Sequence, residues 1–425
     1  MQTLLEIAIA MTAGLFVSRL AKMLKLPAVT GYLVAGILVG PYFLGRLGIG
    51  GLGFVDAASV QALGLISDVA LGFIAFSIGN EFRLSQLKTT GKQATVIGIV
   101  QAVVATLTVD VILIALHFAF SDKLSLPMAI LLGAIASATA PAATLMVVRQ
   151  YKSEGKLTDL LLPIVALDDA VGLVVFAISF GVAKAMLNGN VDMVSILVNP
   201  LAEIVLSLVL GTVMGILFSM AEKFFHSNSK RLSLAVTAVI LTVALSKLQF
   251  AIGPVQIGFS SLLVCMMLGT VFCNMCDFSD EIMAKTDKWT APLFMLFFVI
   301  SGAELELNVF ADVTIVIIGL TYILARSAGK YFGARWSAGW VHCDGNIRKY
   351  LGVTLLPQAG VALGMSVTVQ SLGADGSMVR NIVLFGVLIY ELIGPLCTKL
   401  ALTKAGDIHP KADVQAISDA DEDEE

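Results

Sequence analysis

Apolar residues occupy most of the chain in blocks of about 20, separated by short polar stretches, as far as about residue 398. A helix needs about 20 consecutive apolar residues to cross the roughly 30 Å hydrocarbon core of a bilayer. The pattern therefore predicts an all-α polytopic membrane protein. About thirteen transmembrane helices are expected, with approximate ranges 3–20, 27–44, 60–80, 93–118, 126–148, 159–183, 198–220, 232–249, 255–273, 290–304, 313–334, 350–371 and 377–398.

Composition supports the membrane assignment. The 425 residues are 57% hydrophobic and 14% charged, whereas soluble domains are about 45–50% apolar and about 25% charged. The first apolar block carries Glu6, lacks a basic segment before it and has no small-residue cleavage pattern after it. It is therefore expected to be the first span and not a signal peptide.

Basic residues predict the orientation, because cytoplasmic loops of membrane proteins are enriched in Lys and Arg. One set of alternate loops holds 20 of the 27 basic residues, and the other set holds 5. This asymmetry predicts an odd number of spans, with the N-terminus outside and the C-terminus in the cytoplasm. The two remaining basic residues, Arg326 and Lys330, lie inside an apolar span.

An internal repeat links the two halves of the sequence. Three short patterns recur in the same order at offsets of 227, 223 and 216 residues: P-x-x-x-G-aromatic, G-x-E-x-x-L and a proline-interrupted span. The paired patterns lie seven spans apart, so the repeats are expected to have opposite orientations. Inverted repeats with a broken helix in each half are typical of secondary transporters.

The repeat also suggests a domain organisation. A transmembrane domain over 1–405 would contain inverted repeats of about 1–185 and 232–400, joined by a linker helix at about 198–220. Residues 406–425 end in "SDADEDEE", a composition typical of a disordered, solvated tail.

Two adjacent acids, Asp168 and Asp169, stand in the apolar run "PIVALDDAVGLVVFAISF". A charged residue at the bilayer centre costs about 2.5–3.5 kcal/mol on insertion scales, and such residues mark ion pathways. A carboxylate that binds either a proton or a small cation exchanges one for the other. Helical neighbours point 100° apart, so one acid is expected to face the ion and the other a fixed base, either Arg326 or Lys330. Lys330 could instead extend to the interface.

Prolines predict where the backbone opens. Pro141 and Pro357 each remove a helical hydrogen bond in corresponding spans of the repeat. Unpaired backbone at membrane depth is tolerated where it is buried in protein or lines a wet cavity. Ser137, Thr139 and Gln358 lie beside these breaks and offer further oxygens to a hard cation.

The sequence resembles the monovalent cation:proton antiporters, in the branch called cation:proton antiporter-2, over residues 1 to about 405. The segments that carry the resemblance are "LPAVTGYLVAGILVGP", "GFIAFSIGNEF", "SATAPAATLMVVRQ", "LDDAVGLV", "PLFMLFFVISGAEL" and "LLPQAGVALG". The resemblance implies a dimerisation domain, a core domain with two crossing unwound helices, and elevator-like transport by a homodimer.

The resemblance also implies residue roles. Asp169 would bind the cation and the proton, and Asp168 would pair with Lys330, or failing that with Arg326. Many relatives carry a glutamate where Gly360 stands here, which leaves open how the second broken helix coordinates an ion. Two carboxylates with a basic partner resemble the electrogenic members, so two protons per cation are expected.

These observations predict an antiporter of Na⁺ or K⁺ against protons in the plasma membrane of a prokaryote. The metal ligands would be Asp168 and Asp169, and the expected partners are the two ions, lipid and a second copy of the chain. No enzyme activity, cofactor or nucleic acid is expected. The alternatives are a sodium-coupled symporter of an organic anion, on a related inverted-repeat fold, and a non-transporting sensor.

Overall fold

The computed structural model describes residues 2–23, 28–49, 52–80, 82–140, 144, 147–148, 151–187, 199–225, 227–248, 250–252 and 255–408. For some residues inside these elements, Asp169 among them, only the backbone is described. The α-helices are α1 (Gln2–Met23), α2 (Ala28–Val39), α3 (Ala57–Gln61), α4 (Gly64–Asn80), α5 (Leu84–His117), α6 (Leu126–Ala136), α8 (Lys156–Leu187), α9 (Asn199–Glu222), α10 (Asn228–Ser246), α11 (Ser261–Met275), α12 (Ser279–Ala303), α13 (Val313–Trp340), α14 (Gly345–Thr354), α15 (Gly360–Val369) and α16 (Ala374–Ala405). Short 3-10 helices are Leu44–Leu47, Leu307–Ala311 and Gln370–Leu372.

The helical architecture confirms the fold class that the hydrophobic pattern predicts. Among the described residues, 8 helices are long and apolar enough to cross a membrane, and shorter apolar helices accompany them. The protein is therefore an integral, multi-pass membrane protein. The total of thirteen spans stays a prediction, because length and composition alone do not show which of the shorter helices cross.

One predicted span begins at the wrong residue. The sequence predicts a helix from 255, but β1 (Phe250–Ile252) and β2 (Val255–Ile257) form an antiparallel hairpin there. Valine and isoleucine favour the pleated conformation. The following helix, α11, starts later because the side chain of Ser260 caps it by accepting a hydrogen bond from the backbone N–H of Leu263.

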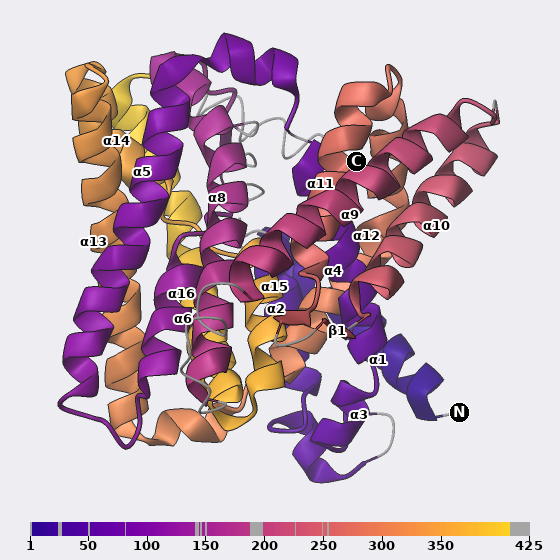
Figure 1. Ribbon diagram of the computed structural model, residues 1–425. Helices are drawn as coiled ribbons and strands as arrows, with labels where there is room; N and C mark the ends of the chain where they lie inside the picture. Colours follow the sequence, from indigo (N-terminus) through magenta and orange to yellow (C-terminus); the bar gives the residue numbers. More distant parts are fainter. Residues whose placement is uncertain are drawn as a thin grey trace.

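The helices form two bundles that stand side by side in Figure 1. One bundle contains α5, α6, α8 and α13 to α16, with its most extensive contact between α5 and α13. The other contains α1, α2, α4 and α9 to α12. Each bundle contains helices from both halves of the sequence, so segments far apart along the chain are packed together.

Small residues allow the tightest helix crossings. A side chain added at Gly302 in α12 would place its Cβ 2.1 Å from the backbone oxygen of Leu33 in α2. At Gly36 in α2, an added Cβ would lie 2.0 Å from the backbone oxygen of Val299 in α12. Close backbone approach at small residues is the usual way in which membrane helices associate.

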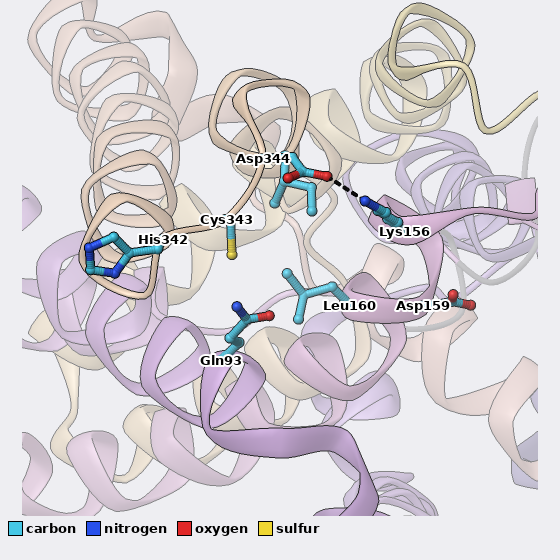
Figure 2. Close-up of a pocket in the computed structure, with 8 residues that line it drawn as sticks. Gln93, Lys156, Asp159, Leu160, His342, Cys343 and Asp344 are labelled. Atoms are coloured by element: carbon cyan, nitrogen blue, oxygen red, sulfur yellow. Dashed lines mark hydrogen bonds and ion pairs between the residues drawn. The ribbon is translucent and has the colours of Figure 1, made fainter.

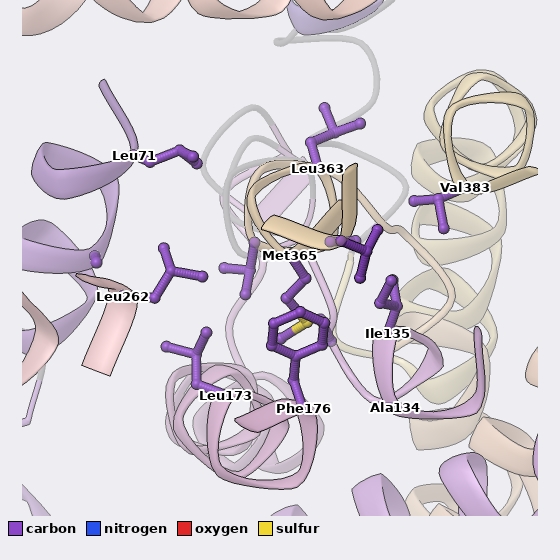
Figure 3. Close-up of a cluster of buried hydrophobic side chains, with 14 of the residues drawn as sticks. Leu71, Ala134, Ile135, Leu173, Phe176, Leu262, Leu363, Met365 and Val383 are labelled. Atoms are coloured by element: carbon purple, nitrogen blue, oxygen red, sulfur yellow. The ribbon is translucent and has the colours of Figure 1, made fainter. Parts of the chain in front are cut away.

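The two bundles share a large apolar cluster around α15. Leu363 and Met365 of α15 lie at its centre, with Phe176 of α8 beneath Met365 in the view of Figure 3. Leu71 of α4 and Leu262 of α11 reach the same cluster from the other bundle. The contact between the bundles is therefore apolar at this level, and apolar surfaces can slide past each other without breaking directional bonds.

Candidate functional site

Both helices that the sequence predicts to be interrupted are interrupted. Helix α6 ends at Ala136 with Ser137 as its C-cap, and residues 138–140 leave the helical conformation. Helix α14 ends at Thr354, and α15 begins at Gly360 after a non-helical stretch that contains Pro357. The two breaks meet, because the backbone N–H of Ala140 donates to the carbonyl oxygen of Pro357 at 2.9 Å. Pro141 lies outside the described residues.

Arg326 binds the open carbonyls of both breaks. Its guanidinium donates to Ala136 O at 3.1 Å, to Ala138 O at 2.6 Å and to Leu356 O at 2.7 Å. The side chain is 0% exposed, and its Cζ atom lies 4.5 Å from the centre of the Tyr390 ring. A positive charge at the carbonyl ends of α6 and α14 interacts favourably with the dipoles of these helices. Arg326 therefore binds the broken backbone, and its hydrogen bonds to described residues go to backbone carbonyls and not to Asp168.

Lys330, one turn further along α13, contacts Asp168. Its ammonium lies 2.6 Å from Asp168 Oδ2 and 2.9 Å from Thr139 Oγ1, and it also donates to the backbone oxygen of Ser137. Lys330 and Asp168 are both 0% exposed. Lys330 is therefore directed into the bundle, and the alternative that it extends to the membrane interface is wrong.

Asp168 has a hydrogen-bond donor on each carboxylate oxygen. Thr139 Oγ1 and Lys330 Nζ donate to Oδ2, and the amide of Gln101 in α5 donates to Oδ1. A buried ion pair is stable only when the remaining hydrogen-bonding positions of the carboxylate are satisfied. The three donors meet this condition and hold Asp168 in one orientation.

The sequence analysis missed Gln101 and Tyr322, which are both buried at the site. Neither carries a charge, so neither stands out in an apolar span. Tyr322 OH exchanges hydrogen bonds with the amide of Gln358, at 3.2 Å to Oε1 and 2.9 Å to Nε2. Gln358 Nε2 also donates to Ile135 O at 3.0 Å. Gln358 thus links α13 to the first break and makes no hydrogen bond to Asp168.

The other predicted ligands differ in how they are placed. Thr139 lies against Asp168, whereas the hydroxyl of Ser137 donates to Ala134 O at 2.6 Å in its own helix. The backbone of Asp169 continues α8 directly after Asp168, and its side chain is outside the described part of the chain.

A cavity of about 470 Å³ lies at the ends of α5, α8 and α13 that adjoin basic loops. Figure 2 shows the pair of Lys156 and Asp344 on one side of it and Gln93 on the other. The ammonium of Lys156 donates to Asp344 Oδ2 at 2.8 Å, and this contact lowers the pKa of the Asp344 carboxyl. On α5, Ile97 lies one turn after Gln93, and on α8, Ile164 lies one turn before Asp168; both isoleucines are 0% exposed. Apolar residues therefore separate this cavity from Asp168.

Known proteins share both the sequence pattern and the fold of this chain. The family model for the transmembrane sodium/hydrogen exchanger matches residues 7–404. No curated protein matches the sequence significantly. Among solved structures, the sodium proton antiporter MjNhaP1 from Methanocaldococcus jannaschii at pH 8 superposes with a TM-score of 0.74 at 17% identity, covering 95% of this chain and 99% of that one.

A second MjNhaP1 structure, determined by electron microscopy, gives a TM-score of 0.63 at 18% identity and covers 97% of this chain and 96% of that one. At such identities the superpositions show a shared fold. The family match covers nearly the whole described chain, including both helix breaks and the Asp168–Lys330 pair. The chain therefore belongs to the sodium/hydrogen exchanger family.

Proposed function

We propose that the protein exchanges Na⁺ or K⁺ for protons across the membrane, with Asp168 and Asp169 as the site at which the two ions compete. Membership of the sodium/hydrogen exchanger family supports cation/proton antiport in general. The observation that carries the residue assignment is the buried Asp168 carboxylate, which three donors hold beside Asp169 where two broken helices cross.

The two acids have different roles in this proposal. Asp168 accepts hydrogen bonds on both oxygens and is paired with Lys330 in this structure. Asp169, one position along α8, binds the cation after it releases its proton. A single carboxylate cannot hold a proton and a cation fully at the same time, so binding of one ion expels the other.

Alternating access would use the contact between the bundles. The bundle with α5, α8 and α13 carries the site, and the bundle with α2, α4 and α12 would remain fixed in a homodimer. Largely apolar contacts such as Leu262 with the α15 cluster support a sliding movement. We further propose that the first bundle moves as an elevator and that the inverted repeats are about 1–185 and 232–400.

We propose electrogenic exchange of two protons per cation, because the site combines two carboxylates with a basic partner, Lys330. The second proton requires the Asp168–Lys330 pair to separate during the cycle, and a pair that stays closed would make the exchange electroneutral. The protein would lie in the plasma membrane of a prokaryote. The split of basic residues between alternate loops supports a cytoplasmic C-terminus and an external N-terminus.

Purified protein in liposomes tests the function. A sudden rise in Na⁺ or K⁺ concentration is expected to drive protons across the membrane in the opposite direction to the cation. Because two protons move per cation, the exchange should give a current on a supported membrane as well as a pH change inside the vesicles. Asp169→Asn is expected to abolish both signals. A pH change without current would contradict the proposed stoichiometry. The absence of cation-dependent proton movement in the wild type would contradict antiport and favour a sodium-coupled symporter.

A further inference from the structure

The orientation of the Gln101 amide is fixed by its neighbours. Its nitrogen lies 3.1 Å from the backbone oxygen of Gly98 and within hydrogen-bonding distance of Asp168 Oδ1. A carbonyl and an ionised carboxylate only accept hydrogen bonds, whereas an amide nitrogen only donates them. The nitrogen must therefore face these two oxygens, which leaves Oε1 on the other side of the amide.

Gln101 Oε1 has no hydrogen-bond partner among the described residues, although the side chain is 0% exposed. Buried polar atoms nearly always have a partner, and an exception in a native protein calls for a ligand or water. An amide oxygen is a hard, neutral donor of the kind that non-transition-metal cations bind. The unpaired oxygen belongs to the same amide that holds Asp168, one residue from the acid proposed to bind the ion.

Helix packing fixes the position of Gln101. A Cβ added at Gly333 in α13 would lie 2.9 Å from the Cα of Gln101, so the two backbones approach closely at this point. Lys330 lies three residues before Gly333 on the same helix and contacts Asp168 at 2.6 Å. The crossing of α5 and α13 therefore brings Gln101 to Asp168 Oδ1 and Lys330 to Asp168 Oδ2.

We propose that Gln101 is a selectivity-determining ligand, whose Oε1 completes the oxygen shell of the bound alkali cation while its nitrogen holds Asp168 in place. This inference rests on the proposed function and names a ligand from α5, which contributes neither of the two breaks at the site nor the Asp168–Asp169 pair. A neutral oxygen at a fixed position changes the fit for ions of different radius. Replacing it should alter the order of preference among Li⁺, Na⁺ and K⁺ as well as the affinity.

Cation-dependent thermal stabilisation of the purified protein tests this proposal without requiring transport, because a ligand that binds the folded state raises its melting temperature. Titrations of LiCl, NaCl and KCl are compared with choline chloride at equal ionic strength. Gln101→Met, which keeps the length of the side chain and removes the oxygen, is expected to raise the half-saturating concentration of the preferred cation about tenfold and to change the order of the three ions.

Two further variants separate ligation from folding. Thr106→Val removes a buried hydroxyl of the same helix that, like Gln101 Oε1, has no hydrogen-bond partner in the described part of the chain, and it is expected to leave the half-saturating concentration unchanged. Gln101→Asn keeps both the amide oxygen and the amide nitrogen and is expected to keep cation-dependent stabilisation even if Gln101→Met does not fold.

Three outcomes would overturn the proposal. These are unchanged affinity and ion order in Gln101→Met, loss of stabilisation in Gln101→Asn while Gln101→Met retains it, and a wild type that no alkali cation stabilises. The proposed function is judged separately, by the loss of exchange in Asp169→Asn.

Discussion

Removing the Lys330 ammonium should destabilise the protein strongly. In Lys330→Met, the Asp168 carboxylate keeps Thr139 and Gln101 as donors but loses its buried countercharge at 2.6 Å. Breaking a buried ion pair from one side typically costs about 3–5 kcal/mol, because the remaining charge has no compensation. Both partners are 0% exposed, so water cannot replace the ammonium without rearrangement. We therefore expect the free energy of unfolding to fall by about 3–5 kcal/mol.

Equilibrium unfolding in mixed detergent micelles, followed by circular dichroism, measures this loss. Lys404→Met, which removes an exposed lysine near the end of α16, serves as control and should change the free energy by less than about 0.5 kcal/mol. The double variant Asp168→Asn/Lys330→Met should recover part of the loss, since it leaves no unpaired charge. A loss below about 1 kcal/mol in Lys330→Met, or no recovery in the double variant, would refute the reasoning.

Three further predictions concern residues away from the exchange site. Gly302→Ala should destabilise the contact of α2 with α12, because its Cβ would clash with Leu33 O, and thermal unfolding should show a lower midpoint than for the control Gly339→Ala, where the space is open. Asp407→Ala should cost about 1 kcal/mol in equilibrium unfolding, because the Asp407 carboxylate accepts a hydrogen bond from Thr158 N at 2.8 Å and so caps α8. Lys123 and the backbone N–H of Thr314 lower the pKa of Asp312, which lies in the loop before α13. The stability from this carboxylate is thus present above its ordinary pKa and lost as pH falls below about 4, so Asp312→Asn should flatten the acid limb of the melting temperature against pH; an unchanged acid limb would contradict this.

The main features of the site were predictable because charge is conspicuous in an apolar span. Asp168, Arg326 and Lys330 stand out in the sequence for this reason, and the structure brings all three to the crossing of the broken helices. The breaks themselves were predictable from Pro141 and Pro357, since proline removes a helical hydrogen bond.

The choice between two bases was not predictable from spacing. Arg326 and Lys330 lie one turn apart on α13, and only the register of α13 against α6 decides which one meets the carbonyls and which one meets Asp168. Gln101 was missed because a glutamine in an apolar helix gives no charge signal, and its partner is 67 residues away. The hairpin at 250–257 was missed because a short apolar run does not distinguish strand from helix.

Proton release on cation binding tests the competition at the acidic pair most directly. Weakly buffered, purified protein in detergent is mixed with NaCl or KCl, and a pH indicator measures the protons released per chain, with choline chloride as the blank. We predict that the wild type releases protons with the preferred cation and that Asp169→Asn releases none. Wild-type protein that binds the cation without releasing protons, or an undiminished release from Asp169→Asn, would contradict the assignment of exchange to this carboxylate.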